Sequence, residues 1–120
     1  MTAKISIQPG GVICSYSGPC GLRDVLVAMH EFMQHERYEN FRYAIHDCTD
    51  VESVALDETE LIPVVAQAIG AEYTNKRIKG AIVLNNETGR ALLKKYTELT
   101  GRTVLEFPTL IDAKVWASSV

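Results

Sequence analysis

The spacing of hydrophobic positions along this chain switches repeatedly between two residues, typical of strands, and 3.6 residues, typical of helices. Ile5 and Ile7 alternate with polar residues, and the following Pro9-Gly10-Gly11 predicts a tight turn into a second strand over 12–17. Gly18-Pro19 is predicted to end that strand. The amino-terminal segment therefore predicts a β-hairpin.

The strongest helical pattern follows the hairpin, over 20–36. Its apolar residues recur at helical spacing and are Leu22, Val25, Leu26, Met29, Phe32 and Met33. The segment 41–47 then returns to a period of two, because apolar residues at odd positions alternate with Arg42, Ala44 and His46. We expect this strand to end at Asp47 and a polar loop to begin there.

The second half of the chain repeats the alternation of helix and strand. Asp57 and Glu60 form a capping-box pattern for a second helix, whose apolar stripe reaches Ile69. Because proline disturbs a helix interior, the regular part of this helix is expected to start near Pro63. An apolar strand is predicted over 78–84, and a polar loop over 85–89 leads to a helix for which Gly101 is a good C-cap. The last elements are a strand at 103–107 and a short helix at 110–117.

Strands that alternate with helices predict a single α/β domain over residues 1–120. The sheet is expected to be five-stranded, mixed and mainly parallel, with an N-terminal β-hairpin and about four helices mostly on one face. Arg42, His46 and Lys79 interrupt the apolar pattern and suggest that the other face stays uncovered. A homodimer is the simplest way to bury the apolar residues of such a face, which are Ile13, Ala44, Ala81 and Val83.

Composition and charge narrow the classes of function. A net charge of -3 and a pI near 5.6 argue against nucleic acid as a partner. The amino terminus lacks the pattern of a signal peptide, and no apolar run approaches the roughly 20 residues that span a bilayer. Three cysteines, an odd number, fit a reducing compartment, so we expect a cytoplasmic protein. No glycine-rich phosphate loop is present, and no cofactor is expected.

Several segments together resemble a known family. The strand ending IHDCTDV, the apolar strand AIVLNN and the closing run VLEFPTLIDAKVWA are similar to the bacterial SpoIIAA-like family, small STAS/SEC14-type proteins related to anti-sigma-factor antagonists. Phe107, Ala113 and Trp116 match that family's final strand and helix. The resemblance implies a five-stranded sheet backed by four helices, and a non-enzymatic binding or regulatory role with another protein as partner.

The resemblance also raises the question of phosphorylation. The antagonists carry a phosphorylatable serine in a D-S-S-G-type motif after the strand that corresponds to 41–47. This chain instead has Asp57-Glu58-Thr59-Glu60, with Ser53 a few residues earlier. Acidic neighbours repel a phosphate, so the alternative is that Asp57 caps a helix and Thr59 is an ordinary first-turn residue. Ser53 and Thr59 are the candidate phosphorylation sites.

The carboxyl ends of parallel strands meet at one edge of a sheet, where α/β domains commonly bind their ligands. Three segments should meet there and form a binding edge for a protein or a small polar ligand. Its candidate residues are Gly18, Cys20, Asp47, Thr49, Asp50, Asn85, Asn86 and Thr88. The alternative is that the aspartates and asparagines only cap loops and helices.

Two other classes of function stay open. Cys20 stands at the start of the strongest helix, where unpaired amides and the helix dipole lower a thiol's pKa, so a thiol-based redox enzyme or sensor is one alternative. A carrier of a small apolar ligand or lipid is the other, because aromatic residues could line a pocket between helices and sheet. These are Tyr16, Phe32, Tyr43, Tyr73, Tyr96 and Trp116.

No metal site is expected from the histidines. His30 and His35 are five residues apart and do not share a helix face, unlike the i, i+4 pairs that bind metal. His46 is expected to be half-exposed on the uncovered face of the sheet.

Overall fold

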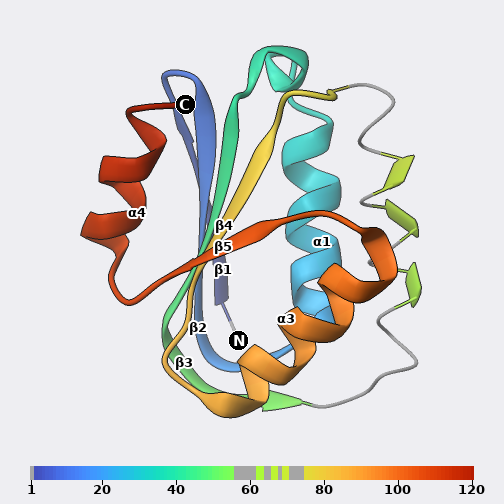
Figure 1. The fold of residues 1–120 in the computed structure, drawn as a ribbon, viewed down its shortest axis with the longest axis vertical. Helices are drawn as coiled ribbons and strands as arrows, with labels where there is room; N and C mark the ends of the chain where they lie inside the picture. Colours follow the sequence, from blue (N-terminus) through green and yellow to red (C-terminus); the bar gives the residue numbers. More distant parts are fainter. Residues whose placement is uncertain (1, 56–61, 64–65, 68, 71–74) are drawn as a thin grey trace.

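A five-stranded sheet forms the centre of the protein in the computed structural model, which describes residues 2–55, 62–63, 66–67, 69–70 and 75–120 (Figure 1). Its strands and helices are, in chain order, β1 (Thr2–Gln8), β2 (Gly11–Gly21), α1 (Leu22–Met33), the 3-10 turn η1 (Tyr38–Asn40), β3 (Tyr43–Ala55), β4 (Lys79–Val83), α3 (Glu87–Thr100), β5 (Val104–Phe107) and α4 (Leu110–Ala117). Between β3 and β4, residues 62–63, 66–67 and 69–70 are helical.

The strands lie side by side in the order β1-β2-β3-β4-β5. β1 and β2 form the antiparallel hairpin, whose turn places Gly10 at a φ of 88° that other residues rarely adopt. Each later pair is parallel, as the helical connections require. The mixed, mainly parallel sheet and the N-terminal hairpin predicted from the sequence are confirmed.

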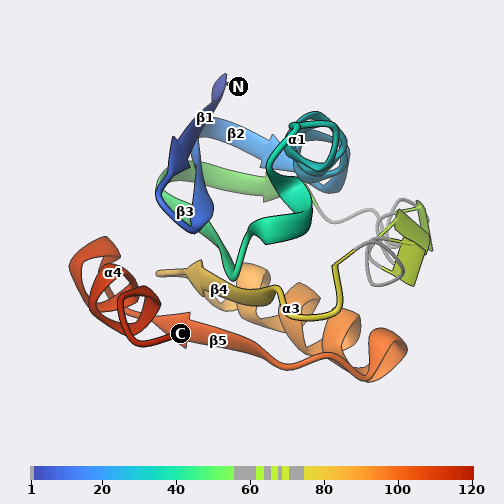
Figure 2. The same cartoon turned by 90° about the horizontal axis from the view of Figure 1, so that it is seen from above.

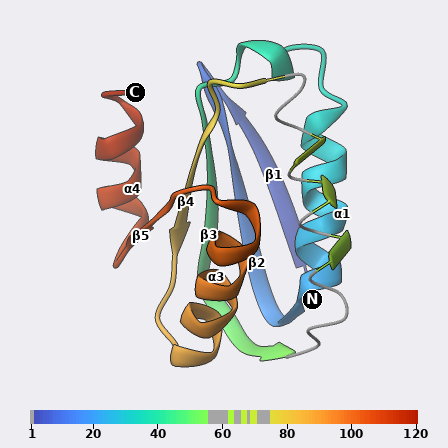
Figure 3. The same cartoon turned by 45° about the vertical axis from the view of Figure 1, so that its right-hand side comes forward.

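α1 and α3 share one face of the sheet, as predicted, but the other face is not uncovered as expected, because α4 lies on it (Figures 2 and 3). Three of the residues assigned to an uncovered face are buried beneath Ala113 and Ala117 of α4, namely Ile13, Ala81 and Val83. The fourth, Ala44, faces α1 and α3 instead. The strand pattern alone did not show that a helix as short as α4 would cover this face.

β2 and β3 are longer than predicted. The parallel pairing continues past Gly18-Pro19, with Gly18 opposite Val51 and Cys20 opposite Val54. Irregularities in register at Ser15/Ser17 and Gly18/Pro19 let the strands continue, and Gly18 accommodates one of them with a φ of 74°. The polar stretch after Asp47 is therefore strand, because it pairs with β2 instead of forming a loop.

The helix ends follow the capping chemistry of the sequence. Asn86 caps α3 by accepting a hydrogen bond from Gly89 N at 2.6 Å, and Gly101 ends it with a φ of 70°. Thr109 caps α4 in the same way, with Asp112 N as donor at 3.2 Å. The capping box expected at 57–60 lies outside the described residues. Within the described part of the chain, no helix has the length and apolarity needed to cross a bilayer.

Candidate functional site

The carboxyl ends of β2, β3 and β4 form one edge of the molecule. Asp50 pairs with Ser17 of β2, and Asp47 pairs with Val83 of β4. Beyond β4, the Asn85 amide donates a hydrogen bond to Thr49 O at 3.4 Å. The three segments chosen from the sequence are thus neighbours in space, although two of them are strands.

Most of the chosen residues lie in regular elements instead of the expected loops. Gly18 and Cys20 lie within β2, whereas Asp47, Thr49 and Asp50 lie within β3. Asn85 and Asn86 connect β4 to α3. Thr88 belongs to the first turn of α3.

Two of these residues support local structure. Asp47 Oδ1 accepts hydrogen bonds from Thr49 N at 3.1 Å and from Thr49 Oγ1 at 2.5 Å. Asn86 is the cap of α3 described above. Both side chains already have partners in the protein, which fits the capping alternative for them.

Five other side chains of this edge are exposed: Thr49, Asp50, Glu52, Ser53 and Asn85. We call them the acidic edge. Asp50 forms no hydrogen bond or ion pair with a described residue, so its carboxylate is available to a partner. The candidate phosphorylation site Ser53 belongs to this surface, whereas Thr59 lies outside the described residues.

Cys20 is not the activated thiol that the sequence suggested. Its side chain is 7% exposed and lies at the end of β2, where Gly21 caps α1 and donates to Asp24 Oδ2 at 2.8 Å. Burial, reinforced by the Asp24 carboxylate, raises the pKa of Cys20 to about 11. The lowering of the pKa expected from the position beside the helix is therefore not found, because desolvation of the thiolate and the Asp24 carboxylate both act in the opposite direction.

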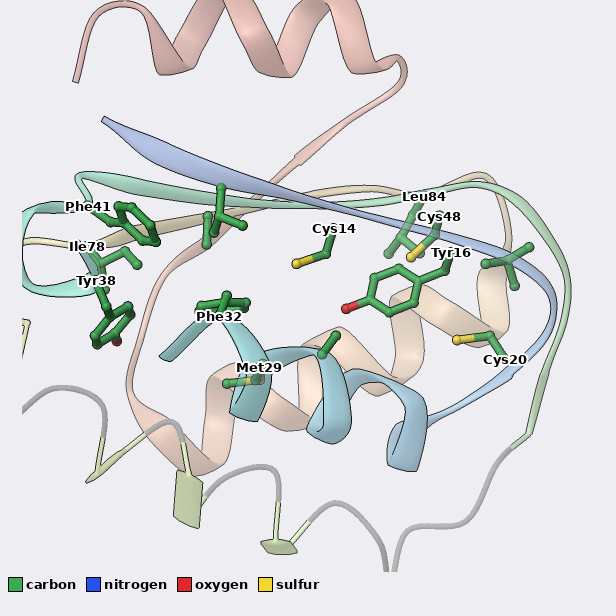
Figure 4. Close-up of a cluster of buried hydrophobic side chains, with 14 residues drawn as sticks. Cys14, Tyr16, Cys20, Met29, Phe32, Tyr38, Phe41, Cys48, Ile78 and Leu84 are labelled. Atoms are coloured by element: carbon green, nitrogen blue, oxygen red, sulfur yellow. The ribbon is translucent and has the colours of Figure 1, made fainter. Parts of the chain in front are cut away.

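The other two cysteines are also buried and free. Burial raises the pKa of Cys14 and of Cys48 to about 12. Figure 4 shows all three sulfur atoms around the ring of Tyr16, on the side of the sheet that faces α1. Thiols with such raised pKa values are poor nucleophiles at neutral pH.

His46 is the residue whose role the sequence analysis missed. It faces the interior on the α1 side, and its Nδ1 lies 2.8 Å from the Tyr16 hydroxyl oxygen. The two rings are stacked with centroids 5.9 Å apart, and the ring of Phe32 lies 6.2 Å away. Burial lowers the pKa of His46 to about 4, so the ring is neutral at pH 7.

One signal in the sequence points to this pair. In the parallel register Cys14 lies opposite His46, and Tyr16 shares a face with Cys14. The alternation of faces within each strand is readable from the sequence, but the register between the two strands is not, because it depends on the pairing of segments that are far apart in the chain.

The described residues contain no group of three His, Cys, Asp or Glu side chains arranged to hold a metal ion. His30 Nε2 instead lies 2.8 Å from Nε2 of Gln34, the C-cap residue of α1 one turn further on.

Comparisons with known proteins give similarity only at the level of structure. No family model and no curated protein matches the sequence. The unphosphorylated anti-sigma factor antagonist SpoIIAA superposes with a TM-score of 0.64 at 6% identity, covering 98% of both chains. An anti-sigma factor antagonist from Mycobacterium paratuberculosis gives 0.66 at 17% identity, covering 98% of this chain and 93% of that one.

A third structure comes from an uncharacterised protein of Shewanella loihica PV-4 that has a SpoIIAA-like fold. Its TM-score is 0.59 at 15% identity, and the alignment covers 97% of this chain and 92% of that chain. These likenesses extend over nearly the whole chain and agree with the resemblance found in its motifs. The protein therefore has the SpoIIAA-like fold.

Proposed function

We propose that this protein is a non-enzymatic regulatory module that binds another protein through the acidic edge. The observation that carries the proposal is the SpoIIAA-like fold, which two anti-sigma factor antagonists share over nearly their whole length. Its three free thiols suit the reducing cytoplasm, where we expect it to act.

The chemistry of the acidic edge supports this role. Two carboxylates, two hydroxyls and one amide lie exposed on adjacent segments, and these groups can form hydrogen bonds without rearrangement of the core. Asp50 and Glu52 give the edge a negative charge, in line with the net charge of -3. A partner with a basic surface fits it, because opposite charges accelerate encounter and fix the orientation of binding.

The proposal is tested by replacing Asp50 with a photo-crosslinking amino acid in the native host. Glu98, exposed near the other end of α3, is the matched control position. We expect one discrete crosslinked product from position 50 and none from position 98. Equal crosslinking at both positions, or none at position 50, would show that the acidic edge is not the binding surface.

Phosphorylation would act on the same surface. Ser53 is exposed beside Glu52, so a phosphate there would add to an existing negative charge and change the affinity for a basic partner. Thr59 remains the second candidate site. Mass spectrometry of protein from its native host should find a phosphorylated fraction, and an unmodified peptide under every growth condition would remove this part of the proposal.

Self-association is a further proposal, although α4 covers the face that first suggested it. Among the exposed apolar side chains, two lie together on α4, where Ile111 is 74% exposed and Val115 is 66% exposed. A homodimer would bury these residues. Light scattering that shows a monomer at high micromolar concentration would exclude it.

A further inference from the structure

A cavity of about 170 Å³ lies between the sheet and the helices α1 and α3. Apolar side chains form most of its wall, among them Met29, Phe32, Cys48, Ile82 and Leu93. An apolar cavity of about 150 Å³ is large enough to admit benzene. The space is therefore sufficient for a small organic molecule.

The aromatic residues proposed from the sequence divide around this cavity. Phe32 and Tyr96 line it, and Tyr16 lies behind its wall as the partner of His46. Tyr43 and Trp116 pack instead against the opposite face of the sheet, near α4. Tyr73 lies outside the described residues.

His46 supplies a polar group to this wall. His46 as a residue is partly accessible to water, yet burial of its ring lowers its pKa to about 4. The two observations agree if the accessible atoms face the cavity and not the outer surface. Nδ1 is engaged by Tyr16, so the accessible edge of the ring carries Nε2.

The hydrogen-bond accounting of the buried side chains supports this orientation of Nε2. Among the described residues, no buried side-chain nitrogen or oxygen lacks a hydrogen-bond partner. The structure gives Nε2 no hydrogen bond with a described residue, so this nitrogen is an accessible atom that can bond to a ligand.

The hydrogen-bond chain assigns the proton on this ring. Burial raises the pKa of Tyr16 well above 10, so its hydroxyl keeps its proton. Imidazole nitrogen is a better acceptor than the nearby Cys14 sulfur, and Tyr16 therefore donates to Nδ1. The neutral imidazole then carries its own proton on Nε2. The cavity consequently presents a hydrogen-bond donor in an apolar wall.

We propose that this cavity binds a compact, uncharged, mostly apolar molecule whose single acceptor oxygen takes a hydrogen bond from His46 Nε2. An aromatic ketone of about the size of acetophenone has this chemistry. The site is separate from the acidic edge, so the proposal does not depend on the regulatory function.

The positions of the charged groups favour a neutral ligand. Arg102 lines the cavity at one end, where its Nη2 donates to Ile78 O at 3.2 Å. Lys79 shares a strand face with Ala81 and Val83, which pack under α4, so its side chain points away from the cavity. His46 lies opposite Ile82 in the parallel register, and Ile82 is three residues beyond Lys79, the first residue of β4. His46 is therefore about 10 Å along the strand from that end of the cavity. A carboxylate placed at His46 would therefore be buried without a nearby opposite charge.

The test compares three fluorinated probes that share a ring: 4-fluoroacetophenone, 1-ethyl-4-fluorobenzene and 4-fluorobenzoate. Binding is followed by ¹³C-methyl methionine NMR, because Met29 and Met33 both line the cavity and a bound ring shifts their methyl signals. We expect the ketone to shift both signals saturably and to bind at least tenfold more tightly than the benzoate. Absence of binding up to the solubility limit, or tighter binding of the benzoate, would overturn the proposal.

His46→Phe isolates the hydrogen bond, because it keeps a ring but removes the donor. The ketone should bind about fivefold more weakly to this variant, while the hydrocarbon keeps its affinity. His30→Phe, at an exposed position on α1 outside the cavity wall, should leave both affinities unchanged. Equal loss of both probes in His46→Phe would show that His46 shapes the cavity and does not donate to the ligand.

A second measurement needs no variant. The imidazole ¹⁵N spectrum of the wild-type protein should show the His46 proton on Nε2, and only the ketone should shift that nitrogen. A proton on Nδ1, or a hydrocarbon that shifts Nε2 equally, contradicts the proposed donor. Ala44→Val, which adds volume at a buried residue of the cavity wall, should weaken both uncharged probes. Unchanged affinities in that variant would place the probes elsewhere.

Discussion

The two faces of the central sheet are built from the same strands but packed differently. The buried residues under α4 are small and branched aliphatic: Ile13, Ile45, Ala81, Val83, Ala113 and Ala117. Partly buried hydrophobic residues pack around them, namely Tyr43, Phe107, Leu110 and Trp116. We call this the closed face. On the cavity face, toward α1 and α3, the structure combines aromatic rings, three thiols and a polar pair around a cavity of about 170 Å³.

This difference suggests that alternate residues of one strand have different roles, one set in stability and the other in lining the cavity. In β3, Ile45 points to the closed face and is fully buried, whereas its neighbours Ala44 and His46 line the cavity. Close packing on one face contributes stability, and it allows the other face to keep unfilled volume and a hydrogen-bond donor. Binding residues are then placed on rigid strands.

The largest expected effect comes from matched isoleucine truncations on the two faces. Ile45→Ala should lower the free energy of unfolding by about 3–5 kcal/mol, because it opens a new cavity in a filled core. Ile82→Ala, in a cavity wall, should cost about half as much, since this side chain is only partly buried and part of its surroundings is already empty. Urea unfolding measures both losses. Equal losses would contradict the difference in packing.

The pH dependence of stability tests the polar pair on the cavity face. The pKa of His46 is about 4 in the folded protein, below its ordinary value of 6.5, so folding favours the neutral ring. Its contribution is fully present above pH 6.5 and is lost as the pH falls through 4. The loss is at most about 3 kcal/mol, and access of water to the cavity reduces it.

His46→Phe should remove this part of the acid destabilisation between pH 6.5 and 4. The control His30→Phe should lose stability with acid as the wild type does, because it keeps His46. Denaturant unfolding at several pH values measures the slopes, and identical slopes in all three proteins would mean that the His46 ring is not held neutral by burial.

Smaller effects are expected at the two helix caps, one on each face. Asn86→Ala and Thr109→Ala should each lower the stability by about 1 kcal/mol, because each removes a side-chain acceptor from a helix N-terminus. Only Asn86→Ala should also change the affinity of 4-fluoroacetophenone, since α3 forms part of the cavity wall. A similar change in Thr109→Ala would show that the two faces are coupled.

The sequence predicted the helices and strands better than it predicted which face of the sheet each side chain occupies. The hairpin, Gly101 as the C-cap of α3 and the closing helix at 110–117 follow from local chemistry, and the structure confirms them. The covered face, the extension of β2 and β3, and the interior position of His46 depend on pairing between distant segments. Cys14 lies opposite His46 in the regular part of the pairing between β2 and β3, and no local pattern encodes the register of two segments so far apart in the sequence.

The candidate site shows the same limit. Residues placed near strand ends by the sequence are indeed close in space, as Thr49 and Asn85 are. Whether a thiol such as Cys20 is activated depends on burial, which reverses the effect expected from its position before a helix. Spacing along the chain predicts proximity, but it does not predict solvation.

The most direct test of the contrast between the two faces is a crystal structure of the protein under xenon pressure. Xenon enters apolar cavities without chemical selectivity, so it reports accessible volume alone. We predict xenon density between α1, α3 and the sheet, beside Met29 and Phe32, and none between α4 and the sheet. Density under α4, or an empty cavity face, would contradict the account.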